Sequence, residues 1–136
     1  MVNDDNPSAL SSVTASARRC LAAPAFHEVF FDELARRAPG AVALFAGADE
    51  RILRNFLRNA ITLLLMDAAG SPQAASKLDY VRTHHGPDSL NVRPEWFVHW
   101  VESLMHSVRG IDPEYSATLE ASWRRVIAAG VQKVIP

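Results

Sequence analysis

The sequence predicts an all-α fold, and three observations support this prediction. Apolar residues recur at the three- and four-residue spacings of helices along most of the chain. No stretch alternates apolar and polar residues for long enough to indicate a strand. Proline and glycine stand between the apolar stretches, where they favour loops between helices. We therefore expect roughly six or seven helices of ordinary length.

Length and composition indicate one small globular domain. The 136 residues are 49% hydrophobic and 21% charged, which is enough apolar material for one core. The formal net charge of -1 disfavours nucleic acid or an anionic membrane surface as a partner. The single cysteine, Cys20, excludes an internal disulfide, and the most apolar run, Ile61 to Met66, is too short to cross a bilayer. We therefore expect a cytoplasmic protein.

Five apolar stripes place the expected helices along the chain. Each repeats at helical spacing, so each predicts a helix with one face toward the core. The stripes are Phe26-Phe30-Leu34-Ala38, Leu53-Phe56-Leu57-Ala60-Ile61-Leu64, Leu78-Val81-His85, Phe97-Trp100-Val101-Leu104-Val108 and Leu119-Trp123-Val126-Ile127-Gly130-Val134.

Capping and turn residues predict where several helices begin and end. Two sharp starts combine a capping side chain with proline at the first helical position, at Ser71-Pro72 and Asp112-Pro113. A third start, at Pro94-Glu95, is less sharp because the preceding arginine is a poor cap. Helix ends are expected at Gly70, Gly86 and Gly110.

The histidines are the main candidates for chemistry. Their spacing forms no zinc-binding motif, and no nucleophile–base pair or glycine-rich phosphate loop stands out. A histidine on a helix is usually packed or solvated, and this is what we expect of most of them. The five are His27, His84, His85, His99 and His106.

His85 differs from the others because it continues an apolar stripe to a helix end. A neutral imidazole in that position can offer one nitrogen to an iron ion. Its other ring N–H can donate to a free carbonyl of the last helical turn, which would fix the tautomer. The alternative is that His85 only caps its helix through the dipole. His84, about 100° further round the helix, is expected at the surface.

The order and spacing of Phe31, Pro39 and Phe45, followed by His85, resemble the globin family, and in particular a group of bacterial single-domain globins. Phe45 lies six residues after Pro39, as the haem-stacking Phe follows the corner Pro in globins. Phe31 lies fourteen residues before Phe45, where globins place a distal-pocket residue. Other matching residues are Ser16, Arg19, Cys20, Pro24, Arg93, Pro94, Glu95, Phe97, Trp100, Asp112, Pro113, Trp123, Arg124, Gly130 and Val131. The resemblance implies a globin domain over residues 13–136, after a flexible segment over residues 1–12.

The resemblance also implies haem b as the cofactor, with His85 as the iron ligand. The remaining haem-contacting residues that it implies are Phe31, Phe45, Leu53, Phe56, Leu57, Val81, Val92, Phe97 and Trp100. The register of the distal helix stays open. Counting forward from Phe45 puts Leu53 and Leu57 over the haem, whereas counting back from His85 favours Phe56 and Ala60.

Both registers give an apolar distal pocket. Many bacterial globins carry Tyr at the position of Phe31 and Gln at that of Leu53, and these side chains hydrogen-bond a bound gas. Such a donor contributes about 1–3 kcal/mol, so its loss weakens O₂ retention about tenfold or more, and CO and NO retention less. We therefore expect reversible binding of diatomic gases, as a carrier, scavenger or sensor.

Two other functions are alternatives to gas binding. One is a haem-free, globin-like regulatory module that works through protein contacts. The other is an enzyme, a nitric-oxide dioxygenase or a peroxidase-like haem protein. We do not expect an enzyme, because 136 residues leave no space for a reductase domain and the distal side lacks an acid–base residue. The partners that we consider are a redox partner and a second copy of the chain, with Trp96 as an exposed dimer contact. We expect His27 to pack between helices or to lie near the distal side.

Overall fold

The computed structural model describes residues 5–86 and 89–136, which form helices joined by loops with no strand among them. The helices are α1 (Asp5–Ala22), α2 (Phe26–Arg37), α3 (Pro39–Val42), α4 (Glu50–Ala68), α5 (Pro72–His84), α6 (Glu95–Ile111) and α7 (Ala117–Val134), with the 3-10 helix η2 (Ala43–Phe45) after α3. The prediction of an all-α fold is therefore confirmed. None of the helices in the described ranges is long and apolar enough to cross a membrane.

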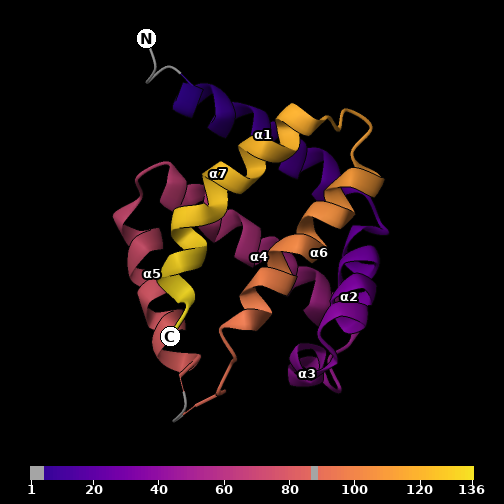
Figure 1. Ribbon diagram of the computed structural model, residues 1–136, viewed down its shortest axis with the longest axis vertical. Helices are drawn as coiled ribbons and strands as arrows, with labels where there is room; N and C mark the ends of the chain where they lie inside the picture. Colours follow the sequence, from indigo (N-terminus) through magenta and orange to yellow (C-terminus); the bar gives the residue numbers. More distant parts are fainter. Residues whose placement is uncertain (1–4, 87–88) are drawn as a thin grey trace.

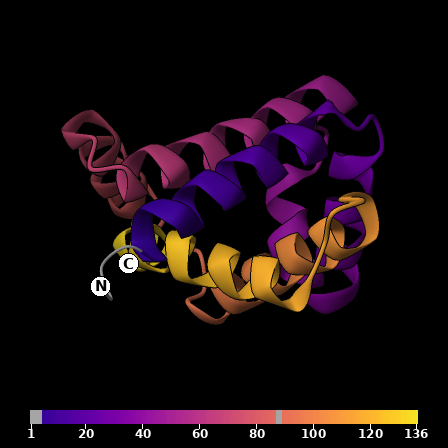
Figure 2. The same ribbon diagram turned by 90° about the horizontal axis from the view of Figure 1, so that it is seen from above.

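The helices pack in crossing pairs around α7 and α6. α7 contacts α1, α4 and α5, and α2 packs along α6 (Figure 1). Seen from above, α1 crosses one end of the molecule over α4 and α7 (Figure 2). The short α3, the end of α5 and the start of α6 all lie at the opposite end (Figure 1).

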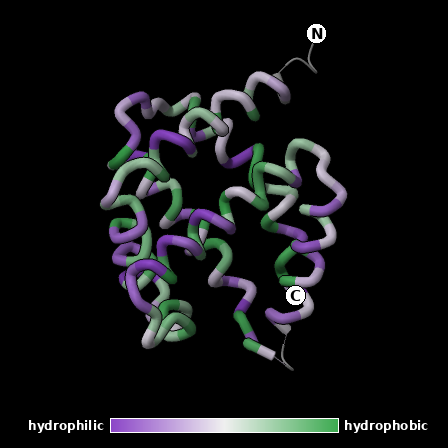
Figure 3. Tube along the Cα trace, turned by 180° about the vertical axis from the view of Figure 1, so that it is seen from behind, coloured by the Kyte–Doolittle hydropathy of each residue, from purple (hydrophilic) through white to green (hydrophobic). Residues whose placement is uncertain are grey.

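The core is built from the apolar stripes of these helices. Hydrophobic and hydrophilic segments are interspersed along the helical turns of the tube, as expected of helices that bury one face and expose the other (Figure 3). The largest fully buried side chains come from five of the seven α-helices, α1, α2, α4, α6 and α7: Trp123, Phe26, Phe30, Leu34, Leu57, Ile61, Leu104, Met105, Ile127, Val13, Val108 and Cys20.

α4 and α7 approach each other closely at Gly130. A Cβ atom added to this glycine would lie 2.6 Å from Leu64 Cδ2, which real contacts do not allow. The absence of a side chain at this position therefore lets the two helices pack at this distance. Leu64 also lines the cavity described below.

A buried polar network joins α1, α6 and α7 at the end where α1 crosses. Trp123 Nε1 donates to Ser16 Oγ over 3.0 Å, and Ser16 Oγ donates to Asp112 Oδ2 over 2.5 Å. Arg19 Nε and Nη2 donate to the two oxygens of Asp112 over 2.7 and 2.9 Å. Burial alone would raise the pKa of Asp112, but the hydrogen bonds from Arg19, Ser16 and the Glu114 N–H lower it to about 2.

The helix start predicted at Asp112-Pro113 is wrong. Asp112 follows α6 as its C-cap, and Ser116 caps α7 by accepting a hydrogen bond from the Leu119 N–H. The physical reason is that the Asp112 carboxylate is already bonded to Arg19 and Ser16, and its remaining acceptor capacity closes a turn with the Glu114 N–H.

The other predicted boundaries fare differently. Ser71 caps α5 through the Ala74 N–H, as predicted, and Gly70 has the positive φ of a residue that follows a helix. Gly110 does not end α6, which continues to Ile111. α1 begins at Asp5, so it already occupies part of the range 1–12 expected to be flexible, while residues 1–4 lie outside the described residues. The division between segment and domain stays a prediction.

Candidate functional site

A cavity of about 400 Å³ lies between α3, α4, α5, α6 and α7. Its volume is within the range of pockets that bind organic ligands. Its lining consists almost entirely of apolar and aromatic side chains, with few polar ones. The lining residues are Leu34, Ala41, Leu44, Phe45, Phe56, Asn59, Ala60, Leu63, Leu64, Leu78, Val81, His85, Leu90, Val92, Trp96, Phe97, Trp100, Val131 and Val134.

His85 is the one histidine among these lining residues. It follows directly on α5 and is half-buried, and its burial lowers the pKa of the imidazole, which favours the neutral form. Its Nδ1 lies 3.0 Å from the carbonyl oxygen of Val134, so a proton on Nδ1 donates to that carbonyl. This arrangement leaves the lone pair of Nε2 available to a ligand.

The acceptor for His85 is not the one expected from the sequence. We expected a carbonyl of the last turn of its own helix, but the acceptor is Val134, the last residue of α7. Carbonyls at the end of a helix have no partner within that helix and are free to accept. The packing of α5 on α7 brings this free carbonyl to the imidazole.

The loop after α5 carries further residues to the cavity. The Val92 N–H donates to the His85 carbonyl over 2.8 Å, and the Asn91 N–H donates to the Gly86 carbonyl over 2.9 Å. Asn91 has a φ of 53°, in the left-handed region that asparagine tolerates better than most residues. The chain thereby turns back toward the cavity, which Val92 and Leu90 line.

Two phenylalanines form one side of the cavity, and a third supports them. The rings of Phe45 and Phe56 line it and pack edge to face, with centroids 4.7 Å apart. Phe31 packs edge to face on Phe45 at 5.3 Å and lies 6.3 Å from Phe56, but it does not line the cavity. Phe31 therefore supports the two lining rings from behind.

The two registers considered for α4 place different residues on the cavity wall. Phe56 and Ala60 line the cavity, whereas Leu53 and Leu57 do not. Leu57 is fully buried in the core, and Leu53 packs against the core. The geometry therefore favours the count back from His85 over the count forward from Phe45.

The sequence reasoning missed Asn59. This amide lines the cavity from α4, three residues after Phe56 and four before Leu63, which both line it as well. The spacing Phe56, Asn59, Ala60, Leu63 is itself helical, so this register would have identified Asn59 as the polar member of the face.

The other sequence-predicted lining residues lie as follows. Val81, Val92, Phe97 and Trp100 join His85 and Phe45 around the cavity, and the rings of His85 and Phe97 have centroids 5.4 Å apart. Trp96 is not exposed, as we had expected it to be, while its role in a dimer contact stays a prediction. It is half-buried, lines the cavity, and lies so close to Gly40 that a Cβ there would approach its ring to 2.9 Å.

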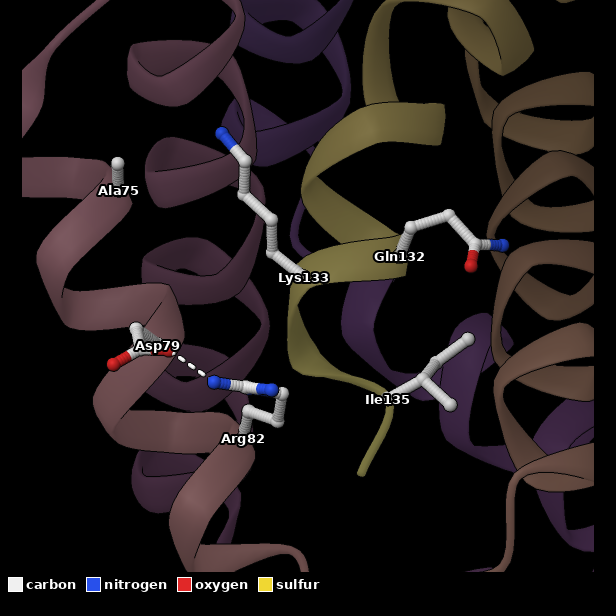
Figure 4. A pocket seen from close by; sticks show the side chains of 6 residues that line it. All are labelled: Ala75, Asp79, Arg82, Gln132, Lys133 and Ile135. Atoms are coloured by element: carbon white, nitrogen blue, oxygen red, sulfur yellow. Dashed lines mark hydrogen bonds and ion pairs between the residues drawn. The ribbon is translucent and has the colours of Figure 1, made fainter.

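A second depression is open to solvent and lies between α5 and α7 (Figure 4). Its charged side chains are paired, because Asp79 bonds to Arg82 over 2.5 Å and Lys133 reaches Asp67 over 2.6 Å. It contains no histidine, and its remaining side chains are Ala75, Gln132 and Ile135. It therefore offers little chemistry compared with the cavity at His85.

Comparisons with known proteins agree with this architecture. The chain is similar to a crystal structure from Pseudomonas aeruginosa PAO1 of a protein described as structurally highly homologous to a human haemoglobin. The TM-score is 0.85, with 29% sequence identity over 93% of this chain and 95% of that chain. No protein-family model and no curated protein matches the sequence. The likeness confirms the globin fold and the resemblance to a bacterial single-domain globin.

Proposed function

From its globin fold, we propose that this protein binds haem b and uses it to bind diatomic gases reversibly. The observation that carries the proposal is the combination of one half-buried imidazole with an apolar cavity. The fold alone is compatible with many functions, so the proposal depends on the site.

The donor set and the cavity lining fit an iron porphyrin. Iron in globins takes a neutral imidazole as its axial ligand, and the burial that lowers the pKa of His85 favours this form. The Val134 carbonyl orients the ring and makes its nitrogen more basic as a ligand. The porphyrin face is apolar and aromatic, and the rings of Phe45, Phe56 and Phe97 offer a matching surface.

Each part of the site has a role in this proposal. His85 would hold the iron, Phe45 and Phe56 would pack on the porphyrin, and Val81, Val92, Phe97 and Trp100 would enclose the side of His85. Phe31 would support the wall, with Leu53 and Leu57 part of the core behind it. The bound haem supplies the iron that takes up the gas.

The wall from α4 favours weak discrimination for O₂. Phe56, Ala60 and Leu63 offer no hydrogen-bond donor, and Asn59 is the one amide on this face. Asn59 is exposed, so water competes for its N–H groups. Bound O₂ draws more stabilisation from donors than CO or NO does, so its affinity suffers most from an apolar wall.

The proposal assigns no enzymatic activity to the cavity. General acid–base catalysis needs a titratable side chain within hydrogen-bond reach of the reacting group. Among the described lining residues, His85 is the only titratable side chain, and it is assigned to the iron. Gas binding as a carrier, scavenger or sensor is the function that remains, with a redox partner or a homodimer still predictions.

Haemin titration of the purified full-length chain tests the proposal. We expect one haem per chain and a Soret band that survives gel filtration, with spectra that change on reduction and again on addition of CO. Loss of the Soret band on the column would contradict haem binding and favour the haem-free module instead. Turnover of NO or peroxide well above that of free haemin would favour an enzyme.

A further inference from the structure

A second group of potential ligand atoms lies outside the cavity, where the start of α2 meets the start of α4. It consists of the imidazole of His27 and the carboxylates of Glu28 and Glu50. One ligand atom from each of the three lies within 4.8 Å of the others. The haem proposal gives these side chains no role.

His27 is the unusual member of this group. Its side chain is 5% exposed, and Nε2 has neither solvent contact nor a hydrogen-bond partner among the described residues. Glu50 Oε1 lies 3.3 Å from Nε2, without the alignment of a hydrogen bond. A buried nitrogen without a hydrogen-bond partner costs free energy. Because this nitrogen faces carboxylates, a cation bound between them would satisfy it.

The distance between these two atoms matches metal coordination. Ligand atoms bound to a tetrahedral zinc ion at about 2.0–2.2 Å lie about 3.3–3.6 Å from one another. The separation of His27 Nε2 and Glu50 Oε1 is 3.3 Å, which is compatible with the edge of such a tetrahedron. Glu28 is exposed on the first turn of α2, so its side chain can move to complete the third position.

We propose that His27, Glu28 and Glu50 form a binding site for a divalent metal ion of the zinc class. One imidazole and two carboxylates are ligands that Zn²⁺ takes readily, with water in the fourth position. Glu50 also accepts a hydrogen bond from Arg54 over 3.1 Å, but this pair is solvent-exposed and contributes little, so it is easily given up.

An ion at this site would connect the two helices behind the candidate haem pocket. His27 lies one helical turn before Phe31 on α2, and Phe31 supports the Phe45 and Phe56 rings. Glu50 begins α4, which carries Phe56 and Ala60. The metal would therefore fix α2 against the first turn of α4.

Isothermal titration of the chelator-treated full-length chain with zinc chloride tests this site. We expect one saturable site in the wild type and affinity at least about tenfold lower in Glu50→Gln, because removing a ligand costs at least as much as disturbing its surroundings. Glu28→Gln should also weaken binding. The matched controls are Glu95→Gln, an exposed acid on the first turn of α6, and His84→Ala, and both should bind zinc like the wild type.

His27→Gln is the most direct variant, but it alters a buried side chain. Because Glu28 and Glu50 are exposed, their variants test the site without changing the core. Equal zinc affinity in the wild type and Glu50→Gln, or a wild-type titration without a saturable site, overturns the proposal. The measurement uses no haem, so its failure is distinct from a failure of haem binding.

Discussion

The two ends of the molecule fill their interiors in different ways. Where α1 crosses α6 and α7, Trp123 is fully buried and its N–H is bonded, and the Asp112 carboxylate is paired with Arg19. At the other end, where the end of α5 and the start of α6 line the same space, side chains leave a cavity of about 400 Å³ beside His85. The first end, which we call the closed end, is filled by side chains of the protein, whereas the cavity at the second end has space for a ligand.

This difference separates the residues that stabilise the fold from those that line the cavity. A closely packed core with satisfied polar groups resists substitution, because every removed atom leaves a void or an unpaired group. Residues around a cavity have fewer neighbours to lose, and Phe56 is already 38% exposed. Substitutions at the two ends should therefore affect different properties.

The largest expected effect is on the free energy of unfolding of Trp123→Ala. This change removes a fully buried indole, so we expect a loss of about 3–5 kcal/mol. Phe56→Ala, at the cavity wall, should cost much less, about 1–2 kcal/mol, because its ring is partly exposed. Urea unfolding of the haem-free chain measures both. Similar losses for the two variants would mean that the cavity wall is as tightly packed as the closed end.

The next effect concerns the acid stability of the closed end. The folded pKa of Asp112 is about 2, below its usual 3.8, so its stabilisation is present above about pH 3.8 and is lost as the pH falls toward 2. This corresponds to roughly 2 kcal/mol. We therefore expect the stability difference between wild type and Asp112→Asn to shrink by about that amount from pH 7 to pH 2.

The acid effect is isolated by comparing the two proteins at each pH. Glu33 and Glu120 also have pKa values of about 2, and hydrogen bonds from arginines contribute to lowering both, so the wild type and the variant share their acid losses. Urea unfolding at several pH values gives the difference. A gap that stays constant down to pH 2 would contradict the depressed pKa of Asp112.

A smaller effect separates the two registers of α4. Ala60→Gln adds an amide donor to the cavity wall, so it should slow O₂ release about tenfold, equivalent to about 1.4 kcal/mol, with less effect on CO. Leu53→Gln is the matched control outside the wall and should change neither rate by much. Stopped-flow dissociation of the haem-loaded protein measures the rates. A larger effect from Leu53→Gln would restore the register counted forward from Phe45.

The smallest expected effect concerns the orientation of His85. A chain that ends at Val134 keeps an acceptor oxygen for Nδ1, whereas a chain that ends at Lys133 loses it. We expect ring ¹⁵N shifts of His85 to show the Nδ1-protonated tautomer in the wild type and in the chain that ends at Val134. Only the chain that ends at Lys133 should lose this preference. The same mixture of tautomers in all three proteins would remove Val134 from the site.

The helices could be predicted from sequence because their signals are local. The stripe that contains Phe26, Phe30 and Leu34 repeats at the spacing that buries one helix face, and Ser71 caps the helix that it precedes. The start at Asp112 was predicted wrongly because its carboxylate bonds to Arg19, more than ninety residues earlier in the chain. Local capping rules do not contain such a long-range partner.

The candidate site could be predicted in part for the same reason. His85 and Phe45 were identified from spacing, and both line the cavity. The acceptor at Val134 was not, because it depends on how α7 packs on α5. Spacing alone could not distinguish Leu53 from Phe56, because both belong to one apolar stripe. The rotation of α4 about its own axis decides which of the two side chains reaches the cavity.

The most direct test of the central claim compares His85→Ala with His84→Ala. His84 is the exposed neighbour, with Nδ1 2.9 Å from the Tyr80 carbonyl oxygen, so it controls for the loss of a histidine at this helix end. Absorption spectra of the haem-loaded ferrous and CO-bound proteins give the result. We predict wild-type spectra for His84→Ala, and loss of the histidine-ligated spectra in His85→Ala that added imidazole restores. Unchanged spectra in His85→Ala would contradict His85 as the iron ligand.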